Sequence, residues 1–276
     1  MTAANVLGQV LARFEEHGIA VVPVKGVVTA RLFYEDVALR HCGDVDLRIR
    51  PQDFRRAIRI ARSNGWTPKT DLPILWQSVA RMMDCEVDIE ATLGPPGLCA
   101  VSVEDVLGRT HEDRSLFGFP FRRIEIHDHG LVLVLNAFKD GFSSLPWSLE
   151  DLRRIAAAPE FRADTLIKRA REGRVATVLW LVADWLARAH GMEEWRRLRD
   201  RVGGTAPSTR VSRLQAWTRS LGSPPKLGLL AAATSSDVPS RAAIGLGLAV
   251  AGVCRGRAER ARRAILERFR VAGGLR

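Results

Sequence analysis

Hydrophobic and polar residues alternate along three stretches of the chain, and this alternation predicts β-strands. Residues 41–49 place apolar side chains at every second position from Val45 to Ile49, as expected for a strand with one buried face. Residues 74–82 and 85–92 form two further stretches, joined by Met83 and Asp84, which predicts a hairpin. Shorter strands are expected at 66–69 and 119–126.

Helical spacing of apolar residues dominates the rest of the chain. Early helices are predicted at 1–16, 27–35, 51–64 and 103–107, and from residue 131 onward. Beyond residue 147 the signals are helical only, at 148–158, 164–172, 175–190, 192–202, 211–221 and 258–271. We therefore expect an α+β protein, with a mixed sheet and flanking helices in a domain at 1–143 and an all-helical domain at 144–276.

Composition is that of an ordinary globular protein, with 276 residues of which 46% are hydrophobic. Its four cysteines, none in a C-x-x-C pair, predict free thiols in a reducing compartment. The longest apolar run, 242–253, is too short to span a bilayer. Because residues 1–16 read as an amphipathic helix and not as a signal peptide, we expect a cytoplasmic protein.

The formal net charge of +11 is unevenly distributed. Residues 1–150 hold 17 Lys and Arg against 20 Asp and Glu, whereas residues 151–276 hold 25 against 11. The basic half is either a surface for an anionic partner or a set of solvated helix faces.

Two carboxylates side by side give the chain its first candidate chemistry. Asp44 and Asp46 are two residues apart in a predicted strand, so they point to the same face, and Gly43 before them allows a close backbone approach. Such a pair needs a cation or a basic group to offset its charge. Carboxylates together with substrate phosphates are the usual ligands of Mg²⁺.

The segment before this pair fits an anion. The apolar run 21–24 ends at Lys25 and Gly26, and the predicted helix 27–35 follows. A strand, a basic glycine turn and a helix start present backbone N–H groups and positive charge to a phosphate.

A third acid is expected on the later hairpin, where Glu86, Asp88 and Glu90 share one face of a strand. Asp88 is the preferred candidate because apolar Val87 and Ile89 place it centrally in the strand. Glu86 and Glu90 remain alternatives.

These motifs together resemble a known family. The series Lys25-Gly26, Tyr34, Arg40, Gly43-Asp44-Val45-Asp46 and Val87-Asp88-Ile89 is similar to that of the bacterial uncharacterised nucleotidyltransferases, within the polymerase-beta-like superfamily. The resemblance covers residues 20–90 and continues weakly through Lys139 and Asp151. Lys25-Gly26 stands where many superfamily members have Gly-Ser, and Glu90 replaces a histidine found in relatives.

The resemblance implies a Mg²⁺-dependent transfer of a nucleoside monophosphate from an NTP such as ATP, with Mn²⁺ as an alternative ion. Asp44, Asp46 and Asp88 would be the catalytic acids and metal ligands. The nucleotide-binding residues would be Lys25, Gly26, Arg40, Gly43 and Lys139.

The acceptor is open among a small-molecule hydroxyl, a tailored natural-product peptide and a tRNA. Two non-enzymatic alternatives remain, a catalytically inactive binding or regulatory module and a basic RNA-binding adaptor. The cluster His127-Asp128-His129 is a further metal candidate, although Asp128 is explained more simply as the N-cap of the helix from residue 131.

Overall fold

The computed structural model describes residues 3–72, 77–95, 98–140, 142 and 146–203. A five-stranded sheet with the order β1-β2-β5-β4-β3 organises the first part of the chain. Its strands are β1 (Val21–Val24), β2 (Asp44–Ile49), β3 (Thr67–Leu72), β4 (Gln77–Met82) and β5 (Cys85–Glu90). Because β2 and β5 are parallel and the other neighbours antiparallel, the sheet is mixed, as predicted.

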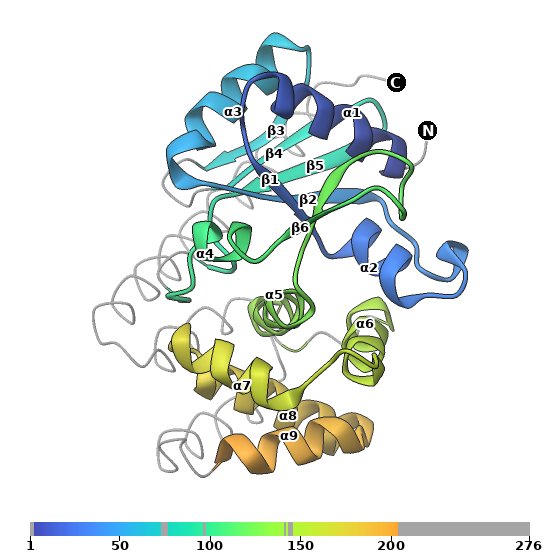
Figure 1. Cartoon of the computed structure of the whole chain (residues 1–276), viewed down its shortest axis with the longest axis vertical. Helices are drawn as coiled ribbons and strands as arrows, with labels where there is room; N and C mark the ends of the chain where they lie inside the picture. Colours follow the sequence, from blue (N-terminus) through green and yellow to red (C-terminus); the bar gives the residue numbers. More distant parts are fainter. Residues whose placement is uncertain (1–2, 73–76, 96–97, 141, 143–145, 204–276) are drawn as a thin grey trace, which may run out of the picture.

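Helices cover both sides of this sheet (Figure 1). The helices α1 (Ala3–Glu16) and α3 (Pro51–Ser63) lie over one face, and α5 (Ile126–Lys139) lies on the other side. Shorter elements complete this part, namely α2 (Gly26–Phe33), the 3₁₀ helix η1 (Val37–Leu39), α4 (Val103–Leu107), and a small hairpin of β6 (His111–Asp113) and β7 (Phe121–Arg123). The predicted α+β class is confirmed.

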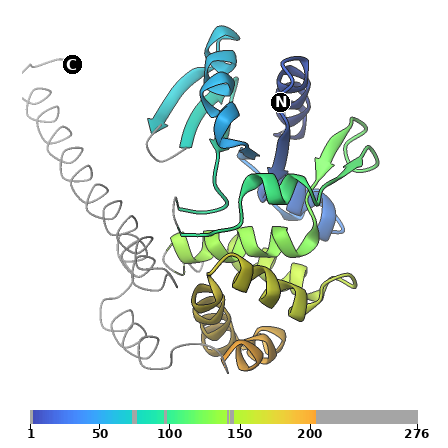
Figure 2. The same ribbon diagram turned by 60° about the vertical axis from the view of Figure 1, so that its left-hand side comes forward.

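Four more helices follow, as the apolar spacing predicts. They are α6 (Pro146–Ala157), α7 (Ala163–Glu172), α8 (Ala176–His190) and α9 (Glu193–Gly203). Figure 2 shows α5 running between the sheet and these helices. The predicted helices at 211–221 and 258–271 and the apolar run 242–253 lie outside the described residues.

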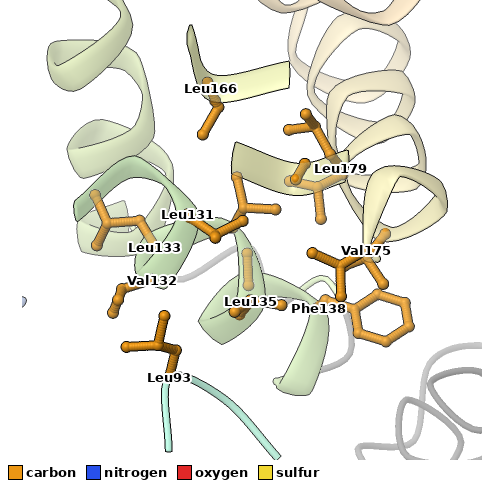
Figure 3. Packing of buried hydrophobic residues seen from close by; sticks show 14 of the residues in the cluster. Leu93, Leu131, Val132, Leu133, Leu135, Phe138, Leu166, Val175 and Leu179 are labelled. Carbon is orange, nitrogen blue, oxygen red and sulfur yellow. The ribbon is translucent and has the colours of Figure 1, made fainter. Parts of the chain in front are cut away.

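Strand alternation divides the apolar residues between two cores. Val45, Leu47 and Ile49 of β2 pack with α1 and α3 in one cluster. The other cluster is centred on α5, whose Leu131 and Leu135 meet side chains from α7 and α8 (Figure 3). This second core also holds β1 residues, so it contains side chains from before and after the predicted domain boundary at residue 143. The division into two domains stays a prediction.

The start of α5 differs from the expectation. The helix begins at Ile126, and the side chain of Glu125 caps it by accepting from the backbone N–H groups of His127 and Asp128. Asp128 is therefore not the N-cap. It lies fully buried inside the helix, where Arg109 donates to it at 2.6 and 2.9 Å.

Within the described ranges, no helix combines the length and the apolar character needed to cross a membrane.

Candidate active site

Acids from two adjacent parallel strands face each other on the polar side of the sheet. Register places Asp46 opposite Asp88, and Asp44 opposite Glu86. Alternation explains this arrangement, because the apolar residues of β2 and β5 point into the opposite core. The two predicted acidic strands therefore do converge, and Asp46 is only 7% exposed.

Lys25 reaches this acidic face from the turn between β1 and α2. Its ammonium Nζ lies 2.5 Å from Asp46 Oδ1 and 3.4 Å from the side-chain oxygen of Asn136 on α5. Burial alone lowers the pKa of Lys25, but the carboxylates of Asp46 and Glu90 offset it, so the net pKa lies above the usual value. The lysine is thus a protonated, desolvated cation beside the acids.

Glu90 is neutralised by its own basic partners. Arg48 Nη2 lies 2.6 Å from Glu90 Oε2, and Lys139 Nζ lies 3.5 Å from Glu90 Oε1. Burial alone raises the pKa of Glu90, and the positive charges of Arg48 and Lys139 reverse this, so the net pKa lies below its usual range. Glu90 is therefore one half of a buried ion pair.

Asp88 has a different environment from Glu90. Its carboxylate accepts from a neutral amide, with Gln77 Nε2 at 3.3 and 3.2 Å from the two oxygens. Burial, followed by the nearby Glu90 charge, raises the pKa of Asp88 to about 6. At the exposed start of β2, packing around the carboxyl group, followed by the Asp46 charge, also raises the pKa of Asp44.

The donor set fits a hard divalent cation in its chemistry. Asp44, Asp46 and Asp88 offer carboxylate oxygens, and burial followed by a neighbouring carboxylate raises the pKa of Asp44 and of Asp88, so a cation would stabilise both negative charges. In the part of the chain that the structure describes, however, no three His, Cys, Asp or Glu side chains are gathered at metal-binding distances. The negative charge of Asp46 is offset by the Lys25 ammonium.

Arg40 braces a helix, and its charge also acts on Asp44. Its Nε and Nη2 donate to Asp151 of α6 at 3.0 Å, and Tyr34 Oη donates to the same carboxylate at 2.7 Å. Asp151 is only 2% exposed. The motif residues Tyr34 and Arg40 thus form a buried network that fixes α6 against the segment leading into β2.

Neither Gly26 nor Gly43 is needed to avoid a steric clash with a side chain. A Cβ added at Gly26 would meet Asp44 Oδ1 and Cys42 Sγ at 3.8 Å, an ordinary contact, and one at Gly43 would meet His41 Nε2 at 3.7 Å. The unusual backbone belongs to Lys25, which has φ 54° and ψ −144°.

The two histidines of α5 are engaged within the protein. His127 Nδ1 contacts Glu125, and its Nε2 accepts from the backbone N–H of Arg162 at 2.8 Å. His129 Nε2 accepts from the backbone N–H of Lys25 at 3.2 Å. These contacts involve three of the four ring nitrogens, and the buried His129 Nδ1 has no hydrogen-bond partner among the described residues.

Three residues of the site were not predicted from the sequence, namely Arg48, Gln77 and Asn136, and His129 was expected only as a candidate metal ligand. Two of them had a signal in the sequence. Asn136 lies three residues before Lys139, hence on the same helix face, and Arg48 continues the polar alternation of Asp44 and Asp46. Gln77 depends on the register of β4 against β5, which pairs it with Glu90.

Similarity to known proteins identifies the family of this chain. A family described as uncharacterised nucleotidyltransferase matches residues 1–190. The chain belongs to this nucleotidyltransferase family. No curated protein matches it.

Solved structures similar to this nucleotidyltransferase include two of the antibiotic-resistance factor ANT(2″)-Ia. A crystal structure with adenylyl-2″-tobramycin is 19% identical, with a TM-score of 0.43, covering 62% of this chain and 97% of the other. A solution structure is 17% identical, with a TM-score of 0.38, covering 79% and 97%. A tRNA-processing enzyme in an apo form is 14% identical, with a TM-score of 0.28, covering 90% and 73%.

Proposed function

We propose that this nucleotidyltransferase moves a nucleoside monophosphate from an NTP to an acceptor hydroxyl or phosphate in a divalent-metal-dependent reaction. The observation that carries the proposal is the pairing of Asp46 with Asp88 across β2 and β5, with the Lys25 ammonium 2.5 Å from Asp46. Family membership supports nucleotidyl transfer in general.

Asp44, Asp46 and Asp88 would hold the metal, Mg²⁺ or alternatively Mn²⁺. When bound, the ion supplies positive charge that stabilises the transferring phosphoryl group and the leaving pyrophosphate. Lys25, paired with Asp46, and Lys139, paired with Glu90, would bind the nucleotide phosphates. Arg40 acts through Asp151 as a brace for the segment that carries Gly43 and Asp44.

Asp88 is suited to receive the proton of the acceptor. Without a metal, burial followed by the Glu90 charge raises the pKa of Asp88 to about 6, and a bound cation would lower it, so the carboxylate is ionised in the loaded site and able to accept a proton. The acceptor oxygen forms a bond to the α-phosphorus, the bond from that phosphorus to pyrophosphate breaks, and the hydroxyl proton passes to Asp88. A phosphate acceptor is already ionised and needs no such base.

The donor and the acceptor class are tested by label transfer. The full chain is incubated with Mg²⁺ and each NTP, labelled at the α or γ position, and offered small-molecule alcohols, a peptide pool or bulk tRNA. Nucleotidyl transfer predicts that α label reaches one acceptor class and γ label reaches none. Transfer of γ label alone would indicate a kinase.

The same experiment separates the enzyme from an inactive binding module. One observation favours the module, since Asp46 and Glu90 are already neutralised by Lys25 and Arg48. Nucleotide binding with no transfer to any acceptor class would support it. Binding of RNA without affinity for nucleotide would support the basic adaptor.

A further inference from the structure

Lys25 has a backbone conformation that residues with a Cβ rarely adopt. Its φ of 54° and ψ of −144° lie outside the regions allowed for most side chains. Such a conformation persists only where the surrounding structure holds it, and it tends to occur at functional sites. The residue concerned is the one whose ammonium meets Asp46.

Contacts at both ends of the residue hold this conformation. The Lys25 backbone N–H donates to His129 Nε2 at 3.2 Å, and the Lys25 carbonyl accepts from the backbone N–H of Thr29 at 2.8 Å. The Thr29 hydroxyl lies 3.1 Å from the same ring nitrogen. His129 and Thr29 are both 0% exposed, so water cannot replace these contacts.

The chemistry of the N–H group fixes the tautomer of the histidine. A backbone N–H can only donate, so Nε2 must carry a lone pair and the ring proton must be on Nδ1, which has no acceptor among the described residues. Burial, followed by the charge of Lys25, lowers the pKa of His129 to about 3, which keeps the ring neutral.

We propose that His129 is the positioning residue for Lys25: its Nε2 accepts the Lys25 N–H and so holds the strained backbone from which the ammonium reaches Asp46. Its significance for catalysis rests on the proposed function, because Lys25 is the expected phosphate ligand. Without an acceptor at this point, Lys25 relaxes to a negative φ and its side chain turns away from the acids.

Two substitutions test the contact itself. In H129F the ring remains but its acceptor is lost, whereas H129Q places an amide oxygen near the position of Nε2. His127 supplies the matched control, since its Nε2 also accepts a backbone N–H, that of Arg162, on the same helix.

Structural readouts on the full chain do not depend on activity. Nitrogen NMR of the wild type should show His129 protonated at Nδ1 and unprotonated at Nε2. Hydrogen exchange of the Lys25 amide should accelerate by about tenfold or more in H129F, stay near wild type in H129Q, and be unaffected in H127F. A proton on Nε2, or unchanged exchange in H129F, would overturn the proposal. If H129F does not fold, the wild-type tautomer decides it, because only a ring unprotonated at Nε2 can accept the Lys25 N–H.

Kinetics test the consequence for Lys25. H129F should lower kcat for nucleotidyl transfer by about 100-fold, with KM changed less, and H129Q should recover most of the loss. In a Lys25→Met background, H129F should cause no further loss, because both changes act through one ammonium. Equal losses in the two backgrounds would overturn the proposal. If the wild type transfers no nucleotide, the proposed function fails while the NMR and exchange results still decide the role of His129.

Discussion

Arg48 binds Glu90 with 2.6 Å between Nη2 and Oε2, and this ion pair gives Glu90 a different role from Asp88 on the same strand. Two residues earlier on each strand, Asp46 faces Asp88, whose carboxylate accepts from the neutral amide of Gln77. Glu86 is paired with Lys69 toward the exposed end of the strand. Of the three candidates, Asp88 is therefore the acid whose charge is left for a ligand to offset.

Replacing Asp88 by asparagine should abolish transfer and stabilise the fold. The pKa of Asp88 is about 6 in the folded protein against 3.8 as the ordinary value, so its ionisation disfavours folding. The stability gained by D88N should be near zero below pH 4, grow between pH 4 and 6, and reach about 1–3 kcal/mol above pH 6. Urea denaturation of both proteins at pH 5 and pH 7.5 measures this. Equal stabilities at pH 7.5 would contradict the desolvated state of Asp88.

Replacing Glu90 by glutamine should have the opposite effect on stability. It leaves the Arg48 guanidinium, 3% exposed, without its carboxylate, at a cost of about 3–5 kcal/mol. The matched control is Glu86→Gln, which breaks an exposed pair and should cost less than about 1 kcal/mol. Denaturation curves of the two variants should differ accordingly, and similar midpoints would argue against the buried pair.

The brace between Arg40 and α6 makes a third prediction. Asp151→Asn weakens the contacts to Tyr34 and Arg40 and should cost about 2–4 kcal/mol, whereas Glu150→Gln, which loses contacts to Arg153 and Arg154, should cost about 1 kcal/mol or less. Thermal unfolding compares the two. A larger loss in the Glu150 variant would contradict the assigned role of Asp151.

His129 should make the protein sensitive to acid. Its pKa is about 3 when folded against 6.5 as the ordinary value, so the unfolded chain binds a proton first as the pH falls. Stability from the neutral ring is complete above pH 6.5 and is lost between pH 6.5 and 3. H129Q should remove about 2–4 kcal/mol of this pH dependence. Denaturation at pH 7 and pH 4.5 measures it, and an unchanged slope would show that His129 is not the titrating group.

Strand alternation was sufficient to predict the acidic face. It placed Asp44 and Asp46 together on β2, and Glu86, Asp88 and Glu90 together on β5, and the parallel register then brought Asp46 opposite Asp88. In the part of the chain that the structure describes, helix positions were predicted to within about five residues because apolar spacing marks the buried faces.

Long-range pairing could not be predicted from these local patterns. Asn136 and His129 contact Lys25 across more than 100 residues, and Arg40 contacts Asp151 across 111. Such pairs depend on how α5 and α6 pack below the sheet, which single-sequence periodicity does not encode. The capping of α5 was mispredicted for a local reason, since Glu125 takes the role assigned to Asp128 and frees it to pair with Arg109.

The central claim is that the Asp46 and Asp88 carboxylates are the reactive centre of a nucleotidyltransferase. Its most direct test is the rate of pyrophosphate release in the presence of Mg²⁺, an NTP and the acceptor class found by label transfer. The wild type is compared with folded D46N and D88N, and with the Glu86→Gln control. We expect each aspartate variant to lose about 100-fold or more while the control keeps its rate. Wild-type rates in both aspartate variants would contradict the account.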